Sequence, residues 1–260
     1  MKTNYFTATF KPDIVDGDIS KLIADDKSDT AFTTNDLLWD WQAIDIPRGA
    51  CALVDACIFM VGEDGGNQSN VDLTLLFAKS VSGTAPTSLG EENSAPSGSY
   101  TLPKHLIGAC KIEGSGNGIG QATLGHGTVY YGNIAGNNGN VMQCILEGEP
   151  ESGTNVGYDK IYCACVCESA GLDFSTGVLA TGAVTSGSAT DITVDTVDVR
   201  KAFQPDDIVY IHDVDTAIGV VSSVPDATSL ILKAANGAAI ANNDEFINAT
   251  PITVTLKFSK

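Results

Sequence analysis

The chain contains 260 residues with a mass of 27.0 kDa, and its 32 acidic against 14 basic residues give a formal net charge of −18. Binding to nucleic acid depends on clustered Lys and Arg, so this charge argues against a direct nucleic-acid partner. No apolar run reaches the ~18 residues of a membrane-spanning helix, and residues 1–10 lack the continuous apolar segment of a signal peptide. We expect a chain that is made in a cytoplasm and has no membrane partner.

Composition indicates a β-rich chain. It has 27 glycines, 3 methionines and only 18% charged residues. This suits short strands joined by many turns, whereas helical chains of this size carry more Glu, Lys and Leu. A chain of this length buries a core without disulfides. The sequence therefore predicts an all-β fold.

The stretch from residue 38 to residue 80 predicts the centre of this fold. Trp39 and Trp41 alternate with polar residues along a strand that ends at a proline. Two apolar runs, residues 52–61 and 71–78, then flank a tip rich in Gly and Asn, which is the pattern of a long hairpin. Because both runs are apolar almost throughout, they predict strands buried on both sides at the core of a jelly-roll-like β-sandwich.

A second pattern begins near residue 184. Residues 184–247 hold five short apolar segments separated by turns, which predicts a small β-barrel of SH3-like or OB-like type. Residues 252–258 alternate as residues 4–10 do, and chain termini often lie close together. We therefore predict that this barrel is inserted near the C-terminus of a main sandwich domain made of residues 1–183 and 248–260. The five segments are Asp191 to Val197, Ile208 to Ile211, Ala217 to Val224, Ser229 to Leu232 and Glu245 to Ile247.

The seven cysteines indicate reduced thiols, because their number is odd. Cys163, Cys165 and Cys167 share one face of a predicted strand, with neighbouring Cβ atoms ~7 Å apart, which is too far for a disulfide. Zinc sites use wider Cys spacings and often add histidines, and neither occurs here. The pattern predicts buried structural thiols.

Three other stretches resemble functional motifs without matching them. Asp16-Gly17-Asp18 lacks the glycine that a calcium loop needs at its sixth position. The glycine run at residues 114–120 lacks the spacing and the following helix of a phosphate-binding loop. His126 stands between two glycines with no Cys or acidic residue near it in sequence, so it is interpreted as a turn residue. No catalytic, cofactor-binding or metal-binding residue, and no cofactor, is predicted.

Residues 81–99 predict a long polar loop with almost no apolar side chains. Loops of this length are uncommon inside a compact domain and are usually either functional or mobile. We interpret this one as an arm that reaches a neighbouring subunit.

Residues 39–50, with the sequence WDWQAIDIPRGA, and the apolar runs that follow resemble virion structural proteins of tailed phages, especially those of the marine cyanophage type. Residues 205–211 (PDDIVYI), 219–224 (GVVSSV) and 243–247 (NDEFI) are similar to small β modules of phage capsid and tail proteins. The resemblance implies a non-enzymatic decoration or cement protein on the capsid exterior. Its implied partners are the major capsid protein and further copies of itself, as a dimer or trimer.

Other functions stay open at this point. A head-fibre, tail or baseplate component uses the same β modules. A carbohydrate-binding receptor-recognition protein or a depolymerase is a second class, in which Trp39, Trp41, Tyr130 and Tyr131 would stack on sugars and Asp40 with Asp45 would form a carboxylate pair. Against this class, tryptophans that alternate with Asp on a strand are expected to face the core. A cytoplasmic host enzyme with an inserted module is the third class.

Overall fold

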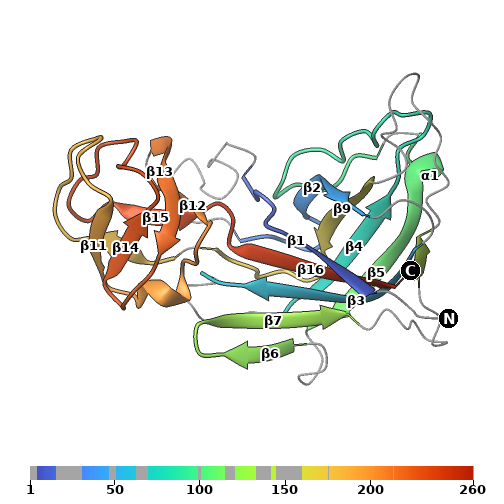
Figure 1. Ribbon diagram of the computed structural model, residues 1–260, viewed down its shortest axis with the longest axis horizontal. Helices are drawn as coiled ribbons and strands as arrows, with labels where there is room; N and C mark the ends of the chain where they lie inside the picture. Colours follow the sequence, from blue (N-terminus) through green and yellow to red (C-terminus); the bar gives the residue numbers. More distant parts are fainter. Residues whose placement is uncertain are drawn as a thin grey trace.

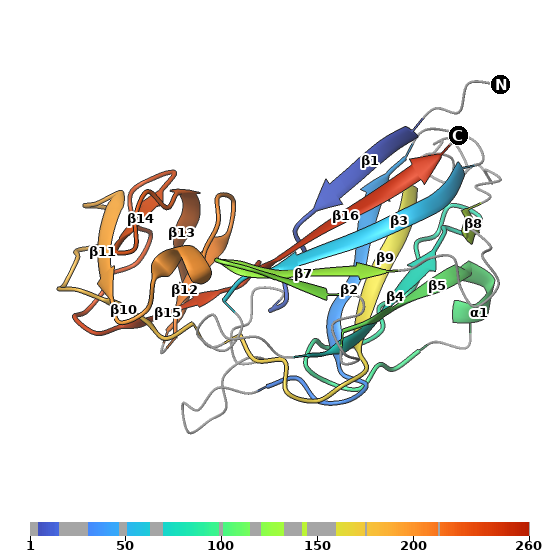
Figure 2. The same cartoon turned by 90° about the horizontal axis from the view of Figure 1, so that it is seen from below.

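A computed structural model describes residues 5–15, 31–46, 51–62, 70–98, 101–114, 121–132, 142–144, 160–174, 176–212 and 214–259. The chain is 52% strand and 4% helix, which confirms the all-β prediction. Two sheets form a sandwich, and a closed barrel lies at one end of it (Figures 1 and 2). Within the described residues, no helix is long and apolar enough to span a membrane.

The first sheet of the sandwich is antiparallel throughout. It is ordered β1-β16-β3-β7-β6, and the short β8 also pairs with β3. These strands are β1 (Tyr5–Phe10), β16 (Ile252–Ser259), β3 (Cys51–Met60), β7 (Gly127–Gly132), β6 (Gln121–Leu124) and β8 (Met142–Cys144).

The second sheet is also antiparallel and is ordered β2-β9-β4-β5. Its strands are β2 (Leu37–Asp45), β9 (Lys160–Cys167), β4 (Asp72–Ala78) and β5 (Leu106–Glu113), and the single-turn helix α1 (Leu102–His105) precedes β5.

The barrel closes through six strands in the order β10-β11-β14-β13-β12-β15. Five of them correspond to the apolar segments found in the sequence. The sixth, β10, was missed because it has only three residues and precedes residue 184. The strands are β10 (Val178–Ala180), β11 (Asp191–Asp195), β12 (Ile208–Ile211), β13 (Val214–Ser223), β14 (Ser229–Leu232) and β15 (Glu245–Asn248), with the short helix η3 (Val199–Lys201) between β11 and β12.

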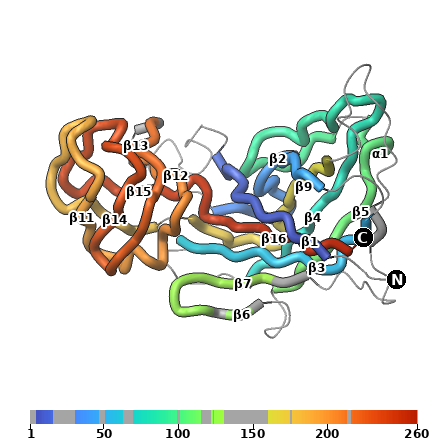
Figure 3. The backbone as a smooth tube through the Cα atoms, viewed as in Figure 1, coloured from blue at the N-terminus to red at the C-terminus, as the bar shows by residue number. Residues whose placement is uncertain are grey.

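After the barrel, the chain returns to the sandwich. Strand β16 lies outside the barrel, between β1 and β3, as the alternation at both ends of the sequence predicted. Figure 3 shows the N-terminal and C-terminal strands side by side. Phe6 is opposite Phe258 and stacks on it, with ring centroids 4.9 Å apart. The exact division into two domains stays a prediction.

The predicted hairpin of residues 52–61 and 71–78 is wrong. Both segments form strands, but β3 belongs to the first sheet and β4 to the second, so they face each other across the core and are not paired. Strand β3 buries alternate residues, such as Ile58 and Met60, so it is fully buried on one side only. Two apolar strands on opposite sides of a sandwich core have the same composition as a paired hairpin, which is why the pattern misled.

The sandwich core collects fully buried side chains from both sheets. Trp39 of β2, Phe77 of β4 and Leu256 of β16 are each at most 1% exposed. Phe10, at the end of β1, packs edge-on against Trp39 with ring centroids 6.5 Å apart. The barrel has a separate apolar core that includes Phe203.

A matched pair of leucine variants tests this core. We expect Leu256→Ala to lower the free energy of unfolding by about 2–5 kcal/mol, because it leaves a cavity between the two sheets. Leu124→Ala, at a side chain that is 50% exposed, serves as the control. Its change should stay within about 0.5 kcal/mol. Urea unfolding measures both, and similar losses would contradict the assigned core.

Candidate functional site

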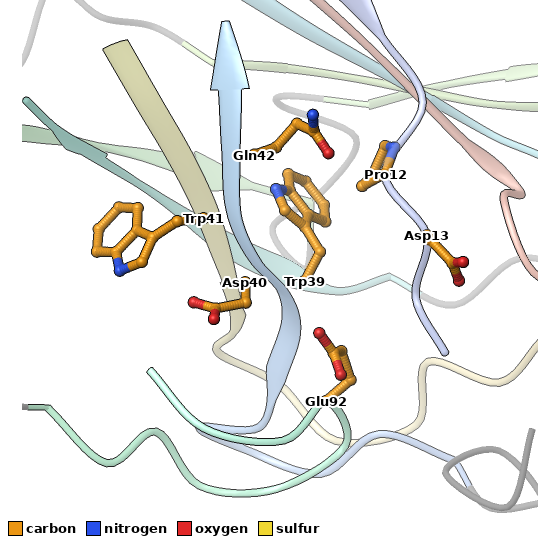
Figure 4. A pocket seen from close by; sticks show the side chains of 7 residues that line it. All are labelled: Pro12, Asp13, Trp39, Asp40, Trp41, Gln42 and Glu92. Atoms are coloured by element: carbon orange, nitrogen blue, oxygen red, sulfur yellow. The ribbon is translucent and has the colours of Figure 1, made fainter. Parts of the chain in front are cut away.

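A recess of about 220 Å³ lies where the edge strands of the two sheets, β1 and β2, run next to each other (Figure 4). Three segments line it: the chain just after β1, the middle of β2, and the loop that follows β4. The lining residues are Pro12, Asp13, Trp39, Asp40, Trp41, Gln42 and Glu92.

A β-bulge in β2 separates the two tryptophans. Trp39 is opposite Cys165 and Gln42 is opposite Cys163, so three steps on β2 match two on β9. The side chains of Trp39 and Trp41 therefore point to opposite sides of the strand (Figure 4). Trp39 is 1% exposed and donates its indole N–H to the Cys163 carbonyl at 3.2 Å. The core-facing prediction is right for Trp39 and wrong for Trp41, because strict alternation assumes a strand without a bulge.

Trp41 lies half-buried on the outer face of the second sheet, under the loop of residues 81–98. Its indole N–H donates to the Thr87 carbonyl at 3.0 Å. The Leu89 backbone N–H donates to Asp40 Oδ1 at 3.0 Å, and the Leu89 side chain is buried. The loop therefore packs on its own sheet, and its contact with a neighbouring subunit stays a prediction.

Backbone hydrogen bonds complete this attachment. The Asn93 N–H donates to the Leu37 carbonyl, and the Leu37 N–H donates to the Ser94 carbonyl, each at 2.8 Å. Two-way pairing of this kind covers the start of the β2 edge. The loop thus holds Glu92, which is 5% exposed, at the recess.

The recess is acidic. Asp13, Asp40 and Glu92 contribute carboxyl groups and Gln42 contributes an amide, and no described lining residue is Lys or Arg. Asp13 Oδ1 accepts the Val15 backbone N–H at 3.0 Å, which fixes its orientation. Carboxylates in a partly desolvated recess attract cations and strong hydrogen-bond donors. The arrangement suits a positively charged group.

The residues considered for sugar binding do not form a common site. Trp39 and Tyr130 are at most 1% exposed, so neither can offer a ring face to a sugar. Asp40 lies at the recess, whereas the side chain of Asp45 is 83% exposed and pairs with Lys160 at 2.5 Å. The side chain of Tyr131 lies outside the described part.

A second candidate site is the junction between sandwich and barrel. The Asp207 side chain is fully buried there and pairs with Lys11 of the sandwich at 2.5 Å. Asp207 Oδ2 also accepts the Gln204 backbone N–H at 2.6 Å and the Asn248 amide at 2.7 Å. Lys11 in turn donates to the Pro205 carbonyl at 2.8 Å. The sequence does not reveal this pair, because Asp206 and Asp207 follow Pro205 and precede an apolar segment, which is the ordinary pattern of a turn.

Burial shifts the protonation of this carboxyl group. Desolvation raises the pKa of Asp207 from 3.8 to about 6, although Lys11 and the hydrogen-bond donors oppose the shift. At neutral pH the group is therefore a carboxylate and the ion pair is complete. Below about pH 6 it gains a proton.

Backbone contacts reinforce the junction on both sides. The Ile14 N–H donates to the Ala249 carbonyl at 2.9 Å, and the Gly62 N–H donates to the Lys201 carbonyl at 2.7 Å. Gly62 has φ +72°, and a Cβ there would lie 3.1 Å from the Ala202 carbonyl oxygen, so this approach favours glycine. The junction is thus a set of short, directional contacts.

His126 lies in the turn between β6 and β7, as its flanking glycines predicted. Its Nε2 atom is 3.9 Å from Asp198 Oδ2, on the barrel. Arg200 Nε donates to Asp198 Oδ1 at 2.9 Å and its terminal nitrogen donates to Oδ2 at 2.7 Å. These bonds to Arg200 lower the pKa of Asp198 to about 2. The turn is a further contact between sandwich and barrel.

Cys163, Cys165 and Cys167 are fully buried thiols, which confirms the predicted structural thiols. They share the core-facing side of β9, and burial raises the pKa of Cys163 and Cys165 well above the ordinary thiol value. Burial also raises the pKa of Cys110 on β5 to about 11. No group of three or more His, Cys, Asp or Glu side chains arranged to hold a metal occurs in the described part of the chain.

Two of the sequence motifs have no described structure. Asp16-Gly17-Asp18 and residues 115–120 of the glycine run lie outside the described residues.

No protein-family model matches the chain, and no match was found among curated proteins. Its function therefore has to be argued from the residues themselves.

Asp207 is expected to give the free energy of unfolding a distinct pH dependence. Because its folded pKa exceeds the unfolded value, its contribution is complete below about pH 4 and is lost as the pH rises through about 6. The change from 3.8 to about 6 corresponds to about 3 kcal/mol. Urea unfolding at pH 4, 5, 6 and 7 should show the stability of the native chain, relative to Asp207→Asn, falling with pH. A flat or rising difference would contradict the assignment.

The contact between Asp40 and Leu89 is open to a separate test. We expect Asp40→Ala to cost about 1 kcal/mol, because it removes the acceptor that holds the loop. Amide hydrogen exchange should become faster at residues 87–97. Asp45→Ala is the matched control on the same strand, since the Asp45 side chain is exposed and its surface ion pair contributes little. Unchanged exchange in Asp40→Ala would show that other contacts hold the loop.

Proposed function

We propose that the chain is a non-enzymatic structural protein of a tailed-phage virion that binds the outer capsid surface and stabilises the shell. In this role it is a decoration or cement protein that contacts the major capsid protein. The proposal rests on the resemblance of residues 39–50 and 205–211 to phage virion proteins, and on the physical properties of the fold.

The junction is the observation that carries the proposal furthest. A protein that clamps neighbouring shell subunits must transmit force between its contact surfaces without bending between them. Here the chain connects the barrel to the sandwich at both ends, before β10 and at β16. The ion pair between Lys11 and the buried Asp207 adds a side-chain contact between the two parts. This construction favours a rigid two-part brace over two independently moving modules.

The acidic recess supports a protein partner. The carboxyl groups of Asp13, Asp40 and Glu92 would attract a Lys or Arg side chain of the shell protein. With a net charge of −18, the chain would also be drawn to basic patches on a shell. Binding of this kind weakens as salt concentration rises.

A head-fibre, tail or baseplate position is the alternative within the same class, since a rigid β brace serves there equally well. Carbohydrate recognition receives less support, because Trp39 and Tyr130 are buried and the indole N–H of Trp41 already has an acceptor.

Copy number in purified particles tests the proposal. Quantitative mass spectrometry on density-purified virions from the source lysate should give a ratio of this chain to the major shell protein near one or a simple fraction. Particles stripped of the chain should lose shell stability on heating and regain it when the purified chain is added. A ratio far below one would favour a vertex, fibre or tail position. Absence from the particles would overturn the virion function.

A further inference from the structure

Strand β1 is an edge of the first sheet as the described residues form it. Strand β16 is the only strand that pairs with β1 in the part of the chain that the structure describes. Tyr5, Thr7 and Thr9 are exposed on the outer face, and Tyr5 is the most exposed large hydrophobic side chain described, at 73%. Phe6, Ala8 and Phe10 on the opposite face are only partly buried against the core.

Strand β1 also lacks the devices that keep edge strands from pairing, namely charges, prolines, bulges and short length. It has six residues, no charge and no proline, and its register with β16 runs without a shift. The other described edges differ. Strand β2 is bulged and partly covered by residues 93–94, β5 carries Lys111 and Glu113, and β6 has four residues.

The sequence of this edge is symmetric. Residues 6–10 read Phe-Thr-Ala-Thr-Phe, which is the same in both directions. If a second copy pairs antiparallel with Ala8 opposite Ala8, each Thr7 lies opposite a Thr9 and each Phe6 lies opposite a Phe10. Side chains of opposite residues then point to the same face, as a twofold axis perpendicular to the sheet requires.

The paired side of β1 already shows how these side chains match. Across the β1–β16 ladder, Thr9 lies opposite Thr255 with the two hydroxyl oxygens 3.2 Å apart. Phe6 stacks on Phe258 with an interplanar angle of 12°. Thr–Thr and aromatic pairs are among the favourable cross-strand pairs. Self-pairing would repeat both kinds on the open side.

We propose that β1 is a self-association edge, at which a second copy of this chain pairs antiparallel about a twofold axis at Ala8. The first sheets of the two copies then form one continuous sheet. The neutral seam brings no like charges into contact, although each chain carries a net charge of −18. Because this overall charge repels the second copy at long range, added salt strengthens the dimer.

This contact does not depend on the virion function. The purified chain is expected to dimerise without shells, so a failure of capsid binding and a failure of self-pairing are separate results.

Sedimentation of the full chain over a range of protein and salt concentrations tests the dimer. We expect a monomer–dimer equilibrium that salt shifts toward the dimer. Thr7→Glu/Thr9→Glu places like charges opposite each other twice, so its dimer should be weaker by about tenfold or more. Thr7→Lys/Thr9→Lys should be weakened similarly, and a mixture of the two variants should dimerise again. Thr190→Glu/Thr193→Glu, at exposed threonines of the barrel, is the matched control and should dimerise as the native chain does.

Cysteine pairing tests the register. A Thr7→Cys chain mixed with a Thr9→Cys chain under mild oxidation should form a disulfide-linked heterodimer, whereas neither alone should crosslink efficiently, because like positions lie diagonally ~7 Å apart. A chain that stays monomeric under all conditions would overturn the proposal. So would dimers that both charge variants form as tightly as the native chain does.

Discussion

The pairing of β16 on both sides is the constraint on which the rest of the structure depends. This strand lies between β1 and β3, and it follows the barrel in sequence. In sequence, all barrel strands come before β16, the last strand of the first sheet. The chain therefore enters the barrel from the sandwich and returns to the sandwich after it. Residues from β16 such as Leu256 and Phe258 also fill the core between the sheets. One strand thus joins the sheet, the core and the barrel.

The functional surfaces follow from this arrangement. With β16 in place, β1 becomes the edge of the first sheet, and its end leads directly to Lys11 at the barrel and to Asp13 at the recess. The self-pairing edge, the junction and the acidic recess are thereby placed along one short segment. A change at that segment would affect all three, whereas the thiols of β9 are buried in the core between the sheets.

The sequence predicted those features that local alternation determines. The all-β class, the small barrel and the pairing of the two terminal strands all appear as period-two patterns or turn signals. The features that the sequence did not predict depend on contacts between residues far apart in sequence. The assignment of β3 and β4 to different sheets leaves their composition unchanged, and the bulge that turns Trp41 outward depends on the register with β9. Asp207 follows Pro205 and Asp206 as a turn residue would. Its ion pair could not be predicted, because its partner Lys11 is 196 residues away.

The proposed brace requires sandwich and barrel to behave as one rigid body. Backbone ¹⁵N relaxation measures it directly, since it reports the rotational diffusion of each part separately. We expect amides of β3 and β4 in the sandwich and of β12 and β14 in the barrel to fit one common diffusion tensor at neutral pH. Faster tumbling of the barrel, requiring its own tensor, would contradict a rigid junction and with it the brace that the proposed function needs.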